Sequence, residues 1–174
     1  TAPAALRRML ATSGANPLQA EYVRITQRGL SANSVLQTVL PGVNVPAIPS
    51  TSIPIDISSS FRLDQDNLAQ QLRVVAQMVA AGQMLGMRRQ VFMVSIGGFD
   101  SHANQMRDQP GLMARVAHGV DYFLSTMSSM GLLNNVALFT ASDFGRALLS
   151  NGDGSDHGWG SHHFVAGGLV AGRQ

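Results

Sequence analysis

The stretch QVFMVSIGGFDSHANQ, residues 90–105, joins an apolar run to a group of polar side chains. Residues 90–96 are apolar almost throughout, as in a β-strand that is covered on both faces. A second run of this kind, NVALFTA, occupies residues 135–141. Between the two runs, apolar residues at helical spacing predict a long helix after Pro110. A strand, a crossover helix and a strand form a βαβ unit, so we expect the two strands to be parallel.

The rest of the chain extends this unit into three parts of one domain. Residues 1–39 predict a helical segment, in which Asn16 is a candidate N-cap. Residues 40–61 are rich in proline and serine and predict an extended loop, because proline removes a backbone donor and biases its neighbours away from helix. Residues 62–174 predict the α/β core, where Asp66 is the candidate cap of a first helix. We therefore expect a mainly parallel sheet flanked by helices.

The composition excludes several classes of protein. The chain has 174 residues, of which 45% are hydrophobic and 13% are charged, and this balance is typical of a globular domain rather than a disordered chain. No run approaches the roughly 18 apolar residues that predict a membrane span. The 12 basic residues are scattered arginines, without the clustered basic stripe of a nucleic-acid-binding surface. Cysteine is absent, which excludes disulfides and thiolate metal sites.

Polar side chains that suit a metal ion follow each predicted strand. In parallel sheets, ligands bind beyond the carboxyl ends of the strands. A third candidate strand, residues 164–170, follows the second after a short connection, so we expect it to return antiparallel and to begin at the same edge. Three separate segments then bring carboxylates, imidazoles and one guanidinium together. These residues are Asp100, His102, Asp143, Arg146, His157, His162 and His163.

This set of side chains predicts a metal centre that acts on an oxyanion. Carboxylates and imidazoles without sulfur suit zinc, manganese or iron better than calcium. Such a centre can polarise a phosphoryl or sulfuryl oxygen and stabilise an attacking oxygen nucleophile. Arg146 adds a forked contact for a tetrahedral oxyanion, which makes it the candidate substrate-binding residue.

Each piece of the predicted centre also has a purely structural interpretation. The Asp and Ser of residues 100–102 are common caps of a helix that follows a strand, and Asp143 could cap a short helix over residues 144–150. The run NGDGSD, residues 151–156, is similar to a calcium-binding loop but lacks its full ligand spacing. One of the adjacent His162 and His163 could hydrogen-bond to loop carbonyls. The conjunction of all three segments favours a shared metal site.

Three motifs carry a resemblance to a known family. They are VSIGGFDSHANQ (residues 94–105), FTASDFGR (139–146) and NGDGSDHGWGSHHFVAGG (151–168). They closely resemble the bacterial family called "domain of unknown function fifteen-oh-one", which is assigned to the alkaline-phosphatase and sulfatase superfamily. The resemblance implies an alkaline-phosphatase-like α/β fold around one or two divalent ions, zinc first, with manganese or calcium as alternatives. Because many members carry twin-arginine export signals, it also implies a periplasmic or secreted protein.

The resemblance assigns roles to individual residues. Asp100 and His102 look like the superfamily's Asp and His pair that follows a central strand. Asp143 looks like the carboxylate of its Asp-His or Asp-Asn segment, where Phe144 replaces the second ligand. His157 matches the late histidine motif, with His162 in reserve.

The function that the resemblance implies is metal-dependent hydrolysis of phosphate or sulfate esters, on a small-molecule or polymer substrate. Superfamily members place a first aspartate ligand and the nucleophile on early segments of the domain. We therefore expect the nucleophile outside this chain, which would be the C-terminal part of a larger protein whose N-terminal part completes the site. The alternative is a secreted, non-catalytic binding or structural protein that retains the fold, and Phe144 favours it.

Overall fold

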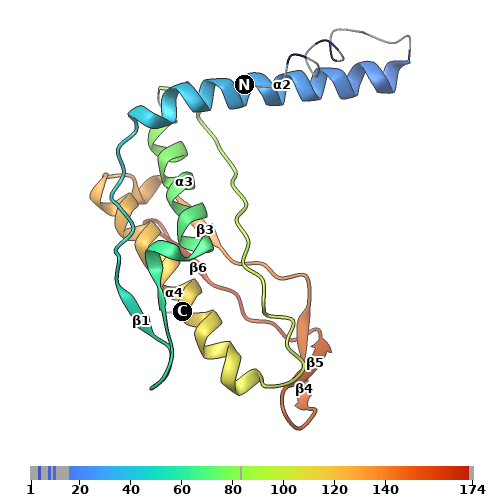
Figure 1. Ribbon diagram of the computed structural model, residues 1–174, viewed down its shortest axis with the longest axis vertical. Helices are drawn as coiled ribbons and strands as arrows, with labels where there is room; N and C mark the ends of the chain where they lie inside the picture. The colour runs from blue at the N-terminus through green and yellow to red at the C-terminus, as the bar shows by residue number, and fades with distance from the viewer. Residues whose placement is uncertain (1–3, 5–7, 9, 11–15, 83, 173–174) are drawn as a thin grey trace. The chain divides into compact units, whose positions relative to one another are not determined.

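The computed structural model describes residues 4, 8, 10, 16–82 and 84–172 (Figure 1). The chain divides into two compact units between Asn44 and Val45, and each unit is described by itself. No helix within the described ranges is both long and apolar enough to cross a membrane.

In the first unit, the described residues 16–44 form the helix α2 (Pro17–Val39), followed by the 3-10 turn η1 (Leu40–Gly42). The side chain of Asn16 accepts a hydrogen bond from the backbone N–H of Leu18 at 2.9 Å, so the predicted N-cap is confirmed. Pro17 occupies the first turn of α2, where a missing N–H costs no helical hydrogen bond. Most of the helix expected over residues 1–15 lies outside the described residues.

The second unit is built on two helices, α3 (Asn67–Ala81) and α4 (Gln105–Ser129), which pack side by side (Figure 1). They approach closely at Gly119, where an added Cβ would already lie 3.4 Å from the Leu68 side chain. Asp66 caps α3 as predicted, because its Oδ1 accepts from the backbone N–H groups of Leu68 and Ala69.

A small apolar core covers one side of this helix pair. Ile53, Leu63, Ala69 and Tyr122 form a buried cluster. The hydroxyl of Tyr122 donates to the backbone carbonyl of Pro46 at 2.8 Å, which satisfies the polar end of a buried ring. This contact ties α4 to the proline-rich segment that precedes the first strand.

Within the described part of the chain, the strands form three antiparallel pairs rather than one sheet. β1 (Ser52–Pro54) pairs with β2 (Ser60–Arg62), β3 (Ala137–Phe139) with β6 (Val165–Gly167), and β4 (Gly145–Ser150) with β5 (Ser155–Gly158). Two further 3-10 turns are η2 (Leu63–Gln65) and η3 (Leu133–Asn135). The antiparallel return expected for residues 164–170 is confirmed, because β6 runs against β3.

The expected fold class, a mainly parallel sheet of the alkaline-phosphatase type flanked by helices, is wrong. Residues 90–96 are extended but are not assigned to a strand. The backbone N–H and C=O of Ser95 bond to the side-chain amide of Gln71, at 3.1 and 2.9 Å, in place of a neighbouring strand. Val91 and Met93 are 98% and 95% exposed, so one face of the segment is uncovered. The predicted strand over residues 90–96, covered on both faces, is therefore wrong.

Three further expectations are corrected by the structure. The second predicted strand, residues 135–141, shortens to the three residues of β3, and Phe139 is 72% exposed rather than buried. Residues 145–150 form β4 instead of a short helix. Helix α4 begins at Gln105, before Pro110, because a loop from elsewhere in the chain accepts its first N–H groups.

Candidate metal centre

Three of the predicted ligands come together. Asp100, His102 and His157 each offer one ligand atom, and these atoms all lie within 4.8 Å of one another. The Nε2 of His157 lies 2.7 Å from Oδ1 of Asp100, and the Nε2 of His102 lies 3.2 Å from the same oxygen. We call Asp100, His102 and His157 the candidate metal centre. Their side chains are 64%, 51% and 45% exposed, so the centre is open to solvent and to substrate.

The β4–β5 hairpin packs against the start of α4 and so places His157 beside Asp100 (Figure 1). Asp153, at the tip of the hairpin, accepts from the backbone N–H of Asn104 at 3.0 Å through its carboxylate. Its backbone carbonyl accepts from the N–H of Gln105 at 3.2 Å. Asp153 therefore takes the capping role at α4, since the side chain of Asn104 makes no cap hydrogen bond.

The hairpin can dock this closely because residue 154 is glycine. An added Cβ at Gly154 would lie 2.8 Å from the backbone oxygen of His102. That separation is too short for any side chain unless the backbone moves. The ligand-bearing segment 100–102 and the hairpin therefore touch backbone to backbone.

A second carboxylate holds the His102 ring from its far side. Oδ1 of Asp156 lies 3.1 Å from Nδ1 of His102, opposite the nitrogen that faces Asp100. Asn151 donates to Asp156 Oδ1 at 3.0 Å and to the His102 carbonyl at 2.9 Å. A carboxylate on one ring nitrogen directs the other toward a metal and fixes the tautomer, so Asp156 suits a supporting role.

Both carboxylates are held in their ionised form. The hydrogen bond from His157 keeps the pKa of Asp100 below its usual range, and the charges of His157 and His102 act in the same direction. The pKa of Asp156 is lowered by hydrogen bonds from His102 and Asn151. Two ionised carboxylates therefore lie next to two histidine rings, and such a set can bind a cation when the rings are neutral.

Phe144 contacts the centre without being able to bind a metal. Its ring stacks on the His157 ring, with centroids 4.1 Å apart and an interplanar angle of 16°. The guanidinium of Arg146 lies 5.2 Å from the Phe144 centroid on this stack. Phe144 therefore restricts the orientation of one of the candidate ligands.

The remaining predicted metal ligands do not belong to this cluster. Asp143 and His162 are not among the grouped ligands, and their roles as ligands stay predictions. His163 lies near two hydroxyls, with Nδ1 3.3 Å from Thr140 Oγ1 and Nε2 2.8 Å from Ser161 Oγ. Sequence reasoning gave no role to Asp156 and Asn151. Their only signal was proximity to His157 in a glycine-rich loop.

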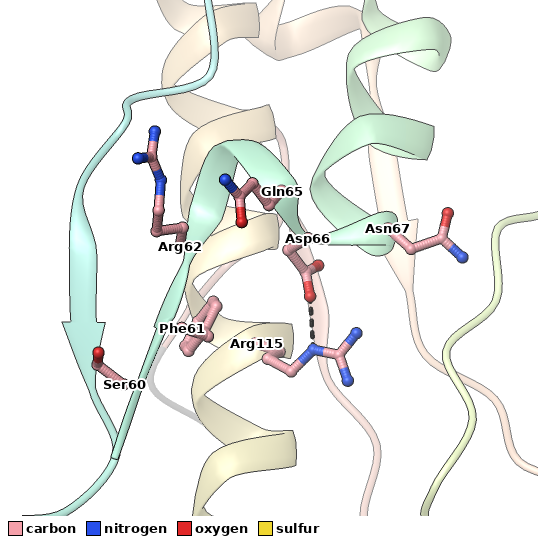
Figure 2. Close-up of a pocket in the computed structure, with 7 residues that line it drawn as sticks. All are labelled: Ser60, Phe61, Arg62, Gln65, Asp66, Asn67 and Arg115. Carbon is pink, nitrogen blue, oxygen red and sulfur yellow. Dashed lines mark hydrogen bonds and ion pairs between the residues drawn. The ribbon is translucent and has the colours of Figure 1, made fainter. Parts of the chain in front are cut away.

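An open cavity of about 500 Å³ lies elsewhere in the second unit, between β2, η2, α3 and α4 (Figure 2). Its lining contains none of the candidate metal ligands. It consists of Ser60, Phe61, Arg62, Gln65, Asp66, Asn67 and Arg115. The Asp66 carboxylate there accepts from Nε of Arg115 while it caps α3, and Arg62 pairs with Asp64. The charged side chains of this cavity already form hydrogen bonds and ion pairs within the fold, so we assign no function to it.

Two imidazoles and a carboxylate, on a chain of helices and short antiparallel strand pairs, define a candidate divalent-metal-binding protein. The family model described as "Protein of unknown function (DUF1501)" matches residues 52–174. The chain belongs to this family, which confirms the resemblance carried by its three motifs. No curated protein and no solved structure matches the chain.

Proposed function

We propose that this protein is a metal-dependent hydrolase of phosphate or sulfate esters, in which Asp100, His102 and His157 bind a divalent ion. The observation that carries the proposal is the convergence of three ligand atoms within 4.8 Å from two segments far apart in the chain. Two imidazoles and one carboxylate form a ligand set of catalytic zinc sites, which leave a further position open for water or substrate. Zinc is therefore the first choice, with manganese and calcium as alternatives.

The proposed chemistry assigns separate tasks to the residues. When bound, the ion would polarise the ester oxygen and stabilise developing negative charge. Asp100 and His157 would hold it from opposite segments, while Asp156 would keep Nε2 of His102 directed at it. Arg146 stays the predicted contact for the oxyanion. The proposal places the attacking nucleophile outside these residues, as the resemblance implies.

Substitution of the ligands tests the proposal. In the native gene product, Asp100→Ala and His157→Ala should each abolish stoichiometric zinc in elemental analysis, together with hydrolysis of p-nitrophenyl phosphate and p-nitrophenyl sulfate. Asp121→Ala and His118→Ala are matched controls, since both residues are exposed on α4 and lie outside the cluster. Both controls should keep metal content and rate. Retention of zinc and of turnover in the two ligand variants would falsify the assignment.

The second candidate function is non-catalytic metal or ligand binding. The direct contact between His157 and Asp100, at 2.7 Å, joins residues 57 apart in the sequence and favours a structural role for an ion at this place. The two candidates separate cleanly by experiment. Stoichiometric zinc that raises the thermal midpoint, without hydrolysis of either ester class, indicates the binding protein.

The cellular location follows from the same resemblance and stays a proposal. We propose that the protein acts in the periplasm or outside the cell. Fractionation of cells that express the native gene, followed by immunodetection, measures this directly.

A further inference from the structure

We infer that Arg146 is a positioning residue of the candidate metal centre, whose guanidinium fastens the two ligand-bearing segments to each other. The inference rests on the proposed function, because it concerns the same centre. It gives Arg146 a task that does not require substrate.

The guanidinium of Arg146 bonds to a backbone carbonyl on each side of the centre. Its Nη1 donates to the carbonyl of Ser155 at 2.7 Å, and its Nη2 donates to the carbonyl of Phe99. Phe99 directly precedes Asp100, and Ser155 lies two residues before His157. One planar fork therefore spans the segment that carries Asp100 and the strand that carries His157.

The backbone of Arg146 is held independently of its side chain. Arg146 lies opposite His157 in the β4–β5 register. Its N–H donates to the Gly160 carbonyl at 2.7 Å, and the Gly160 N–H donates back at 3.2 Å. Loss of the side chain therefore leaves the hairpin pairing in place and removes only the link to Phe99 and Ser155.

Packing fixes the direction of the fork. The Arg146 guanidinium lies 5.2 Å from the centroid of Phe144, and Phe144 stacks on the His157 ring. Phe144 therefore contacts both the Arg146 guanidinium and the His157 ring. A lysine at this position offers a compact charge on a flexible stem, so it cannot hold both carbonyls in this geometry.

If Arg146 joins the two ligand-bearing segments, its loss should have a different effect from the loss of a residue that contacts substrate alone. A residue that only contacts the oxyanion affects the KM and leaves metal affinity unchanged in the absence of substrate. A residue that joins the ligand segments affects metal affinity before any substrate is added. The two outcomes are measured separately on the same variants.

The experiment compares Arg146→Ala and Arg146→Lys with Arg107→Ala. The control loses the same charge, and Arg107 is an exposed residue whose guanidinium pairs with its neighbour Asp108. Zinc affinity, measured by competition with a chromogenic chelator, should fall roughly 10- to 100-fold in Arg146→Ala, as for other residues that orient metal ligands. Arg146→Lys should restore part of this loss, and Arg107→Ala should match the wild type.

A second measurement works on the metal-free protein. Amide hydrogen exchange, followed by mass spectrometry, should accelerate in residues 99–102 and 155–158 of Arg146→Ala and stay unchanged in Arg107→Ala. If both segments exchange as in the wild type and zinc affinity is unaltered, the clamp is refuted, and a rise in KM alone then assigns Arg146 to substrate. If the wild type binds no zinc, the proposed function fails, while the exchange data still decide the clamp.

Discussion

The α3–α4 helix pair and the candidate metal centre each contain an aspartate with close partners, Asp66 in the first region and Asp100 in the second. The Asp66 side chain is 2% exposed, and its two oxygens are committed to two backbone N–H groups of α3 and to Arg115. The Asp100 side chain is 64% exposed, and one of its oxygens faces two imidazoles. Both residues are carboxylates with close partners, but their surroundings differ completely.

The difference separates a carboxylate that stabilises the fold from one that is available for chemistry. Loss of a buried, fully bonded acceptor leaves donors without partners, which costs far more than loss of a solvated one. An exposed carboxylate between imidazoles contributes little to folding, yet it remains accessible to a cation. Three predictions test this contrast. They concern Asp66 at the start of α3, Gly154 in the β4–β5 hairpin, and Asp56 in the turn between β1 and β2.

The largest effect is expected from Asp66→Ala. It removes the cap of α3 and leaves Arg115 without its ion-pair partner, so the free energy of unfolding should fall by about 2–4 kcal/mol. Urea denaturation measures the change. Asp64→Ala is the control, because Asp64 pairs with the exposed Arg62 at the surface and its loss should leave the midpoint nearly unchanged. Equal midpoints for the two variants would break the contrast.

Gly154→Ala should have an intermediate effect that is confined to the metal centre. The new Cβ would meet the His102 carbonyl at 2.8 Å, so the hairpin must move away from the segment that carries Asp100. We expect roughly tenfold weaker zinc binding in the chelator competition, with a urea midpoint close to that of the wild type. Gly97→Ala is the matched control, since nothing lies within 4 Å of its added Cβ. Unaltered zinc affinity in Gly154→Ala would contradict the docked position of the hairpin.

The smallest effect is expected in the turn between β1 and β2. Hydrogen bonds from Ser59 and Ser58 lower the pKa of Asp56 from 3.8 to about 2. Because the pKa of Asp56 in the folded protein lies below the ordinary value, these hydrogen bonds contribute fully to the stability of the fold above pH 3.8. Their contribution to stability is lost as the pH falls through about 2. A carboxyl NMR titration should show the low midpoint, and Ser59→Ala should move it toward 3.8. A midpoint that Ser59→Ala does not change would assign the shift to another cause.

Local rules predicted two helix N-caps correctly, but they did not predict the start of α4 at Gln105 or the strand β4. Asn16 and Asp66 were recognisable as N-caps, because each has a short side chain whose oxygen can accept a hydrogen bond from the first free N–H groups of the helix that follows. The pairing of strands was not predictable in the same way. An apolar run such as residues 90–96 indicates extended backbone, but its partner depends on distant residues, here the side chain of Gln71.

The sequence predicted which residue types form the candidate site, but it did not predict the contacts that hold them in position. Asp100, His102 and His157 were expected together, and the structure brings them together. The β4–β5 register pairs Arg146 with His157, and no short motif encodes that register. For the same reason, sequence analysis missed the position of Asp156 beside His102, which depends on how the hairpin meets α4.

The meeting of His157 with Asp100 closes a long loop that contains all of α4. In a chain without cysteine, an ion held by both residues would take the topological place of a disulfide. Unlike a disulfide, such a cross-link would be reversible: a chelator would open it and added cation would close it. An ion that binds the folded chain and not the unfolded one would stabilise it by mass action, so the free cation concentration would set the stability of the native state.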